Sequence, residues 1–456
     1  MTSIIKVNKH QNACGTNIIQ RCGTTTTIGS GASNTLVMDG SAVTIGRCGG
    51  TVALASGASQ TGFGRTGTVD WQTGSIKTAT FTAANGEGYF ANTAGGAFTM
   101  NLPAGSAGAI VSVQDYNNTF DTHALTVDAN GSEKINGGDG GEPITLDTEG
   151  RGVTFVYIDA TVGWRSVQDN DFTKKGQSAA FIAATGGTIT TVCTNFKVHT
   201  FTGPGTFCVS NAGNTAGSNK LSYLVVAGGG GSGQYYGGAG GGGGFRESKS
   251  PETPYTASPL DETNGLTVTA TGFPITVGSG GAKGGPSYVP GVKGSDSVFS
   301  SITSTGGGFG GGSQSSGQVG GPGGSGGGGG GTSGGAGGTG NTPPVSPPQG
   351  KDGYTAGGSI AGAGGGATVA GGTNPDGKQG GVGATTSINN TPTAYAGGGG
   401  GGPESPTSIS PCGSAGANVT GTPAPLRDGQ TNKGGGGGAD GGAGGSGVVI
   451  IRYKFQ

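Results

Sequence analysis

The sequence has little charge, and it has no long apolar run. Only 10% of its 456 residues are charged, and 23 basic residues nearly balance 24 acidic ones. Because no basic stripe is present, we expect no nucleic-acid partner. The apolar runs, such as Val448–Ile451, are far too short to span a bilayer. Residues 1–10 lack the apolar core and cleavage site of a secretory signal, so we expect the chain to fold in a cytoplasm.

Residues that carry chemistry are also scarce. The six cysteines form no C-x-x-C pair, which argues against a zinc knuckle or a dense disulfide scaffold, and the three histidines form no spaced metal set. Glycine motifs such as Gly323–Gly327 lack the strand–turn–helix context of a catalytic or phosphate-binding loop. Residues 136–142 lack the alternating oxygen ligands of a calcium loop. We therefore predict no cofactor, no metal and no enzymatic activity.

Glycine is abundant, and its distribution divides the chain. Of 111 glycines, 34 lie in residues 1–220 and the other 77 lie in residues 221–456. No helical period stands out anywhere, whereas short apolar and threonine-rich segments alternate with turn signals. The sequence therefore predicts an all-β fold with two chemically different halves.

Residues 1–65 contain a repeat. The segment 21–33, RCGTTTTIGSGAS, returns at 47–59 as RCGGTVALASGAS. A unit this small and polar cannot bury a face alone, so we expect a trimeric β-stalk that also attaches the protein to its assembly. A flexible linker with a chance duplication is the alternative. Cys22 and Cys48 occupy equivalent repeat positions, and we expect them to be buried near the stalk axis rather than to form a metal site or an interchain disulfide.

Residues 66–170 predict a small β-sandwich. Alternating segments occur at 109–113, 125–127 and 153–158, with turn signals between them. The order NLPAGSAGAIVSVQDYNN, ALTVDANGSEKING, EGRGVTFVYIDATVGWRSV over residues 85–168 resembles a small β domain of phage fibre and virion proteins. That resemblance implies a trimeric module along a shaft.

Residues 171–195 are weakly patterned and predict a linker. After it, strands at 196–202 and 206–210 flank Gly203-Pro204-Gly205, which predicts a hairpin. Cys193 and Cys208 can approach each other in such a hairpin, but we expect free thiols because the chain folds in a reducing compartment.

Residues 196–456 carry tracts of consecutive glycine. A collagen triple helix requires glycine at every third residue, which these tracts violate, and a disordered linker does not explain the apolar segments that bracket them. A bundle of polyglycine-II strands explains both, because chains without side chains can approach until their backbones bond to one another. We expect the apolar segments 221–226 and 448–453 to pair as the base of this bundle.

The same residues carry a second resemblance. The segments HTFTGPGTF, SYLVVAGGGGSG, GGAGGGGGFRE, FPITVGSGG, SVFSSITSTGGGFGGG and GGGGGADGGAGGSGVVIIRY resemble the glycine-rich domain of bacteriophage tail fibres and related adhesins. The resemblance implies polyglycine-II strands whose connecting loops touch a host receptor, and it places the chain in a virion that is assembled in the host cytoplasm.

These observations together predict a homotrimeric phage tail fibre. Its N-terminal region would bind other tail proteins, and its glycine-rich tip would bind a bacterial outer-surface receptor, either protein or polysaccharide. The candidate receptor-binding residues lie in the loops 234–236, 286–290, 343–348 with 354, 389–395 and 403–427: Tyr235, Tyr236, Tyr288, Tyr354, Tyr395 and Arg427. The alternatives are a purely architectural virion protein, a polysaccharide-degrading spike and an ice-binding bundle.

Overall fold

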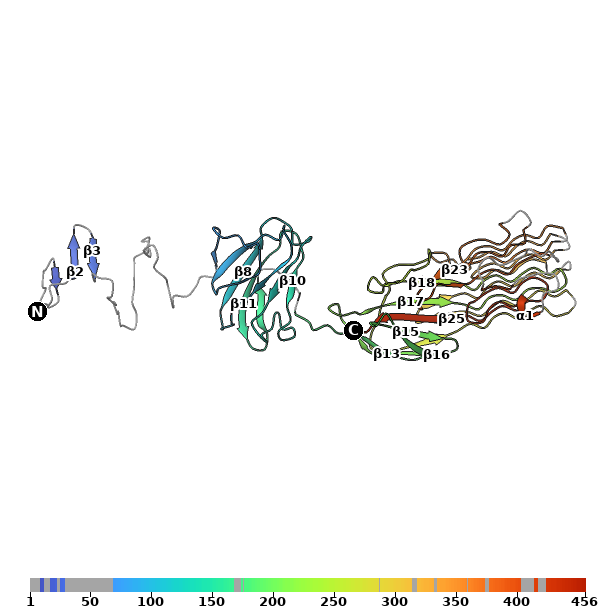
Figure 1. The fold of residues 1–456 in the computed structure, drawn as a ribbon, viewed down its shortest axis with the longest axis horizontal. Helices are drawn as coiled ribbons and strands as arrows, with labels where there is room; N and C mark the ends of the chain where they lie inside the picture. Colours follow the sequence, from blue (N-terminus) through green and yellow to red (C-terminus); the bar gives the residue numbers. More distant parts are fainter. Residues whose placement is uncertain are drawn as a thin grey trace, which may run out of the picture. The chain divides into compact units, whose positions relative to one another are not determined.

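The structure is a computed structural model. It describes residues 9–11, 17–22, 25–28, 69–167, 174, 176–286, 288–313, 318–331, 334–358, 360–373, 377–402, 414–416 and 424–456. These residues form strands and extended chain, with one short helix, α1 (Ala424–Arg427), so the fold is all-β as predicted (Figure 1). Among them no helix has the length and apolar character needed to cross a membrane.

Contacts divide the chain into two units, residues 1–68 and 69–456. In the first unit β1 (Lys9–Gln11), β2 (Asn17–Cys22) and β3 (Thr25–Ile28) form an antiparallel sheet in the order β1-β2-β3. The second copy of the repeat, residues 47–59, lies outside the described residues, as does Cys48. The interpretation of residues 1–65 as a trimeric stalk stays a prediction.

Residues 69–167 form a two-sheet β sandwich. Its strands are β4 (Asp70–Trp71), β5 (Phe81–Thr82), β6 (Glu87–Ala91), β7 (Phe98–Asn101), β8 (Ile110–Asp115), β9 (Leu125–Asp128), β10 (Ile144–Leu146), β11 (Gly152–Asp159) and β12 (Gly163–Val167). The five-stranded sheet has the order β12-β11-β8-β6-β4, and the four-stranded sheet has the order β10-β9-β7-β5. From β4 to β9 the chain alternates between the sheets, so strands that neighbour each other within a sheet are parallel.

The core of the β sandwich lies between these sheets. Val111, Leu125, Phe155 and Trp164 are fully buried there. Buried and more exposed positions alternate along β9 and along the first half of β11, which is the period-two pattern expected for a strand with one buried face. Side-chain packing therefore holds this part of the molecule together.

The C-terminal region begins with two further sheets, which we call the sheet base. Their strands are β13 (Ile182–Thr185), β14 (Thr188–Val192), β15 (Phe196–Phe201), β16 (Gly205–Ala212), β17 (Lys220–Val226), β18 (Phe245–Ser248), β19 (Leu266–Thr267), β20 (Gly272–Thr276), β21 (Ser297–Phe299), β22 (Ile302–Ser304) and β25 (Val448–Lys454). The strand orders are β13-β16-β20-β21-β22 and β14-β15-β25-β17-β18, with β19 beside β17. A separate hairpin joins β23 (Ala384–Thr386) to β24 (Thr393–Tyr395).

Two sequence predictions are wrong at this point. Residues 182–192, expected within the linker 171–195, form β13 and β14 of the sheet base. The strands expected to form a hairpin, β15 and β16, exist but lie in different sheets. The Gly203-Pro204-Gly205 turn carries the chain from one sheet to the other, so that Phe201 and Phe207 enter the same core between them.

The pairing of the two long apolar segments is confirmed. β17 and β25 are antiparallel neighbours, with Tyr223 opposite Ile451. One face of this pair packs between the two sheets, and the other packs against β18 and the β23–β24 hairpin. Because both faces are buried, the strands are continuous apolar runs instead of alternating patterns.

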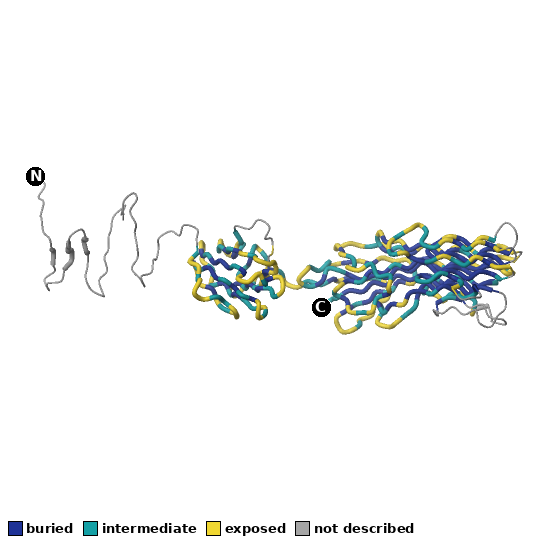
Figure 2. Tube along the Cα trace, turned by 90° about the horizontal axis from the view of Figure 1, so that it is seen from above, coloured by how far each residue is buried: buried dark blue, intermediate teal, exposed yellow. Residues whose placement is uncertain are grey.

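Beyond the sheet base the chain forms a bundle of extended strands, which we call the glycine lattice (Figures 1 and 2). Its segments are 228–233, 238–244, 281–284, 291–295, 306–312, 320–331, 335–340, 350–354, 361–366, 380–383, 396–402, 434–438 and 442–447. Figure 2 shows that this bundle is largely buried in its interior.

The segment 228–233 shows how the lattice is bonded. Its N–H groups donate in rotation to three antiparallel neighbours: residues 228 and 231 to segment 292–295, 229 and 232 to segment 442–445, and 230 and 233 to segment 238–241. A contact that recurs at every third residue requires a helix with three residues per turn. The strand therefore has the polyglycine-II conformation that the tracts predict.

The carbonyl groups of the same segment bond to other chains. Gly228 and Gly231 accept from segment 307–310, Gly229 and Ser232 accept from segment 281–284, and Gly230 accepts from Gly437. One strand is thus hydrogen-bonded to neighbours on all sides, and its buried amides find partners.

Few side chains fit inside this arrangement. A Cβ added to Gly230 would overlap the carbonyl oxygen of Gly308, and one added to Gly240 would overlap that of Gly230. A methyl group is accepted where Ala239, Ala361 and Ala439 meet in one small, fully buried cluster. The requirement for glycine is therefore steric, and it applies separately to each strand of the glycine lattice.

Candidate functional site

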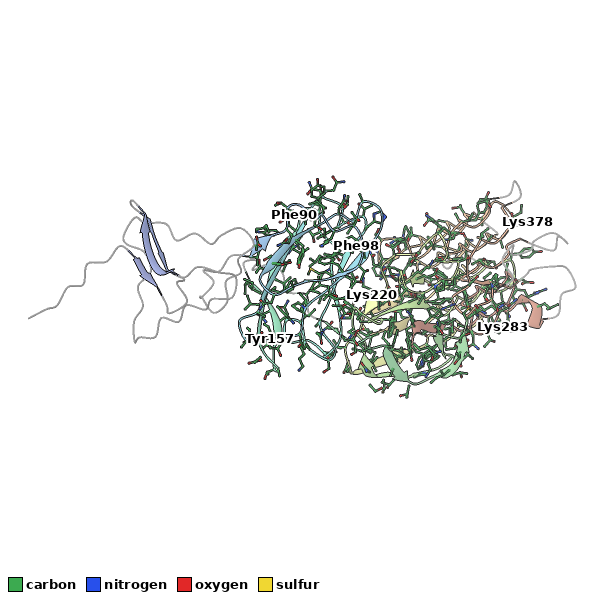
Figure 3. The ribbon with its side chains drawn as sticks, turned by 60° about the vertical axis from the view of Figure 1, so that its left-hand side comes forward. Phe90, Phe98, Tyr157, Lys220, Lys283 and Lys378 are labelled. Atoms are coloured by element: carbon green, nitrogen blue, oxygen red, sulfur yellow. The ribbon has the colours of Figure 1, made fainter. Side chains whose placement is uncertain are left out.

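Loops meet at the end of the glycine lattice that lies away from β25 (Figure 1). The N–H of Gly331 donates to the carbonyl of Tyr236, and Gly312 lies against the backbone of Tyr288. Figure 3 shows Lys283, which lies close in sequence to Tyr288, at the same end. Segments far apart in the sequence therefore come together on one surface, which we call the tip.

Three of the predicted residues are exposed at the tip. Tyr235, Tyr236 and Tyr288 expose 53%, 50% and 40% of their surface. The ring centroids of Tyr235 and Tyr288 lie 5.4 Å apart at an angle of 50°. Val289 beside them is 45% exposed. The tip thus presents a small apolar and aromatic surface to solvent.

The backbone of these tyrosines is unusual. Tyr235, Tyr236 and Tyr288 have φ angles of 51°, 62° and 68°. In this left-handed region the Cβ of an L-residue is crowded, at a cost of about 1–3 kcal/mol per residue, whereas glycine enters it freely. A chain so rich in glycine nevertheless places tyrosine at these three positions.

Arg427 reaches the tip through Asp440. The N–H of Tyr235 donates to Asp440 Oδ1 at 2.9 Å, and Arg427 Nη1 donates to Asp440 Oδ2 at 3.2 Å and to its carbonyl at 2.6 Å. The Arg427 side chain is 21% exposed. Arg427 therefore supports the Tyr235 loop through Asp440, and only part of its guanidinium remains open to a partner.

Tyr354 belongs to a strand of the glycine lattice. Its N–H donates to Ala363, and its carbonyl accepts from Gly329, so its backbone is part of the lattice. Its ring lies over Gly372 and Gly377, where an added Cβ would overlap it. The ring is half-buried against these glycines.

The prediction for Tyr395 is corrected by its burial. Tyr395 is 3% exposed and packs with Phe245 and Ile388 against the sheet base, and burial raises the pKa of its hydroxyl to about 12. Its loop is held by the fully buried Arg452, whose guanidinium donates to the Ile388 carbonyl at 3.2 Å. Tyr395 is a core residue and has no surface to offer a receptor.

A second buried charge holds the same part of the sheet base. Glu247 accepts from Ser258 N at 2.8 Å and from Thr386 Oγ1 at 2.5 Å. Burial raises the pKa of this carboxyl group. The contacts join β18 to the β23–β24 hairpin, so Glu247 has a structural role here.

One further loop of the predicted set is not part of the tip cluster. The loop 343–348 lies near the sheet base, because Gln349 bonds both Pro343 and Thr305, and its carbonyl accepts from Phe245. Most of the loop 403–427 lies outside the described residues. Cys193 and Cys208 are free and exposed. Within the described ranges, no group of three or more His, Cys, Asp or Glu side chains is placed to hold a metal ion.

Sequence reasoning missed Asp440, whereas Val289 lies within the predicted loop 286–290. Nothing in the local sequence connects Asp440 to a tyrosine more than 200 positions earlier, since only the lattice brings the two together. Val289 follows Tyr288 directly, and the grouping Tyr-Val-Pro in a glycine-rich stretch is the one signal that pointed to it.

Comparison with known families agrees with this architecture. Residues 202–454 match the family model of the glycine-rich domain, which covers more than half of the chain. The chain belongs to the glycine-rich domain family. The matched region begins directly after β15 and ends with β25, so it contains the glycine lattice and most of the sheet base. No curated protein sequence matches the chain.

Proposed function

We propose that this protein is a bacteriophage tail fibre that attaches to the host cell through the tip of its glycine-rich domain. The observation that carries the proposal is the group of three exposed tyrosines in left-handed backbone conformations. The proposal includes a homotrimer that joins other tail proteins through its N-terminal region and is assembled in the host cytoplasm. No enzymatic step is assigned to it.

The energetics of the tip favour a contact function. If the loops served only to connect lattice strands, glycine at positions 235, 236 and 288 would avoid the backbone strain. Tyrosine instead supplies a large, rigid contact area with only two side-chain torsions to immobilise. Strain that is kept at a surface is typical of sites where stability is given up for binding.

The lattice supports the same interpretation. Loops that bind a partner lose affinity when they must become ordered on binding. Here the loop ends are fixed by backbone hydrogen bonds such as Gly331 N to Tyr236 O, and Tyr235 is fixed by Asp440. A tip ordered in advance retains more of its contact energy. Its ligand is an outer-surface protein or polysaccharide that accepts tyrosine faces.

The test replaces Tyr235 and Tyr288 by glycine in the full chain. Glycine suits both φ angles, so Y235G/Y288G removes the rings without adding strain. We expect binding of the labelled full chain to host cells to fall at least tenfold, while the glycine-rich domain becomes more stable by about 1 kcal/mol per site.

The matched control is Asn264→Gly, which also changes a left-handed residue, at φ 70°, in a turn of the sheet base. N264G should bind cells as the natural chain does. Equal cell binding by Y235G/Y288G and the natural chain would reject the tip as the receptor site and leave an architectural role for this domain.

A further inference from the structure

A repeated motif lies on one hairpin at the surface of the glycine lattice. Residues 281–284 read Gly-Ala-Lys-Gly, and residues 291–294 read Gly-Val-Lys-Gly. The two segments are hydrogen-bonded neighbours, since the N–H of Val292 donates to the carbonyl of Ala282 at 2.9 Å. We call this feature the lysine hairpin: residues 281–286 and 288–294.

The three-residue period of the strands sorts this motif into two faces. The glycines donate their N–H groups into the lattice: Gly284 to Ser232 at 2.8 Å on the first strand, and Gly294 to Gly307 at 3.0 Å on the second. Positions three apart share a face of a polyglycine-II helix, so the two residues between the glycines lie on the outer face. All four of these residues are exposed: Ala282, Lys283, Val292 and Lys293. The motif therefore displays an apolar residue and a lysine twice on the surface.

The lysine hairpin turns at the tip, where the exposed tyrosines lie. A Cβ added to Gly284 would overlap the carbonyl oxygen of Val289, so the two strands are in contact next to Tyr288. Val289 and Val292 expose 45% and 53% of their surface. Figure 3 labels the Lys283 side chain at this end of the lattice. One exposed surface, which we call the stripe, thus runs from the tip along the hairpin: Tyr235, Tyr288, Val289, Lys283, Val292 and Lys293.

The two lysines of the stripe are not neutralised within the described part of the chain. Among the described residues, neither Lys283 nor Lys293 forms an ion pair. The carboxylates closest to them in sequence or at the tip are used elsewhere: Asp296 accepts from a backbone N–H at 2.8 Å, and Asp440 is held by Arg427. Lysines that serve solubility alone have no need to recur in one motif on paired strands. The stripe therefore combines two available positive charges with an aromatic and apolar surface.

We infer that the stripe binds an acidic polysaccharide of the host surface. The inference rests on the proposed function, and it names the chemical class of the ligand. Tyrosine rings stack on the apolar faces of sugar rings, and lysines bind carboxylate or phosphate groups as point charges. Lys283 and Lys293 lie on opposite sides of the bond between Ala282 and Val292, roughly 6 Å apart along the strand axis. A linear polymer with repeated acidic groups reaches both lysines while its sugar rings contact the tyrosines.

The size of the stripe favours a polysaccharide chain over a protein partner. The lysine hairpin is two strands wide, and about five residues of each strand contribute, so the surface measures roughly 150 Å² at a rise of about 3.1 Å and a strand spacing of about 4.8 Å. A stable complex between proteins buries about 800 Å² on each partner. An extended polysaccharide needs only a narrow contact, and its repeats offer many equivalent sites that raise the avidity.

Binding of the full chain to polysaccharide extracted from host cells tests the inference. Biolayer interferometry compares the native polysaccharide with the same material after its carboxylates are reduced to alcohols and its phosphates are removed. We expect the affinity for the neutralised material to be at least tenfold lower. Raising the salt concentration from about 0.1 M to about 1 M shortens the Debye length from about 10 Å to about 3 Å, and it should weaken binding to the native polysaccharide at least tenfold.

Two double variants locate the effect. Lys283→Gln with Lys293→Gln removes both charges from the stripe, and it should lower the affinity for the native polysaccharide at least tenfold. Lys351→Gln with Lys433→Gln is the matched control, since it removes the same charge from lattice strands close to the sheet base, where the carbonyl of Lys433 accepts from Ala396. K351Q/K433Q should bind as the natural chain does.

Three outcomes would overturn the inference. Equal affinity of K283Q/K293Q and the natural chain, or equal binding of the native and the neutralised polysaccharide, would leave the lysines a role in solubility alone. Cell binding that protease treatment of the cells abolishes, with no binding to the extract, would assign the tip to a protein receptor. In each case Y235G/Y288G separates the two proposals, because loss of cell binding in that variant keeps the tip as the receptor site, whereas unchanged cell binding rejects the tip itself.

Discussion

The β sandwich and the glycine lattice are stabilised in opposite ways. The sandwich buries large side chains such as Phe155 and Trp164 between sheets whose backbones bond only within each sheet. The lattice buries almost no side chain, and its backbones bond in every direction around each strand. The comparison shows that removing side chains, usually a route to disorder, can instead allow a dense hydrogen-bonded solid.

The two strategies fail differently. An apolar core tolerates many substitutions of similar volume, because dispersion and burial have little directional preference. The lattice tolerates few substitutions, since a Cβ added at most of its interior glycines meets a neighbouring backbone group. Glycine also loses the most conformational freedom on folding, so the lattice depends on the sheet base, where Val225 and Ile450 are fully or almost fully buried.

The largest expected effect is the slow amide exchange of the glycine lattice compared with an unstructured glycine-rich chain. We expect glycine amides in segment 238–244 to exchange at least a thousandfold more slowly than in an unstructured chain, at rates close to those of β17 and β25. Their donors are buried and bonded, for example Gly240 N to Gly437 O at 2.8 Å. Exchange within seconds in this segment, with β17 still protected, would show that the lattice is not a folded solid.

A single methyl group gives the next largest effect. Gly240→Ala should lower the free energy of unfolding of the glycine-rich domain by about 1–3 kcal/mol or more, because the Cβ displaces the Gly230 carbonyl. Both tryptophans of the chain lie in the β sandwich, so tryptophan fluorescence reports the unfolding of the sandwich, which G240A should not change. Circular dichroism reports the unfolding of the glycine-rich domain.

Gly285→Ala is the control for this substitution. Gly285 is exposed, an added Cβ there meets nothing within 4 Å, and its φ is not left-handed. The change should stay within about 0.5 kcal/mol. If G240A and G285A were equally mild, the steric account of the glycine tracts would be wrong.

The same comparison explains what the sequence predicted. Glycine tracts indicate a polyglycine-II lattice because only bare backbone suits them, and the apolar runs at 221–226 and 448–453 indicate a buried pair. Both inferences use local composition alone. The short strands β13 and β14 carry mostly alanine and threonine, a weak signal, and were therefore assigned to the linker.

Contacts between residues that lie far apart in the chain could not be predicted from the local sequence. The turn at 203–205 is typical of a hairpin, but whether the chain returns to the same sheet depends on where Phe201 and Phe207 are buried. Tyr395 precedes a glycine tract and Tyr235 follows one, so the local sequence does not distinguish them. Only the fold shows that Tyr395 is buried and Tyr235 is exposed. Asp440 joins the tip through a contact that spans 205 positions.

The smallest effect concerns the buried His199 of the sheet base. Its Nδ1–H donates to the Gly186 carbonyl at 2.7 Å, so Nε2 accepts from the Tyr453 hydroxyl at 3.0 Å, which requires the neutral ring. Burial lowers the pKa of His199 below 6.5. Its contribution to stability is therefore complete above pH 6.5 and is lost as the pH falls toward the folded-state pKa, at up to about 1.4 kcal/mol per pH unit.

Glu247 has the opposite effect on the pH dependence of stability. Burial raises the pKa of its carboxyl group, so its contribution to stability is lost as the pH increases. The test therefore compares the natural chain with His199→Gln, which keeps Glu247 unchanged. Between pH 7 and pH 5 the free energy of unfolding of the glycine-rich domain should fall less in H199Q than in the natural chain, measured by circular dichroism. The β sandwich, followed by tryptophan fluorescence, should show no difference between the two proteins, since His199 lies in the sheet base. If the unfolding free energy of the glycine-rich domain fell equally with pH in both proteins, the His199 ring would not be held neutral by Gly186 and Tyr453. The two hydrogen bonds of His199 would then not contribute to the stability of the sheet base in the way assigned here.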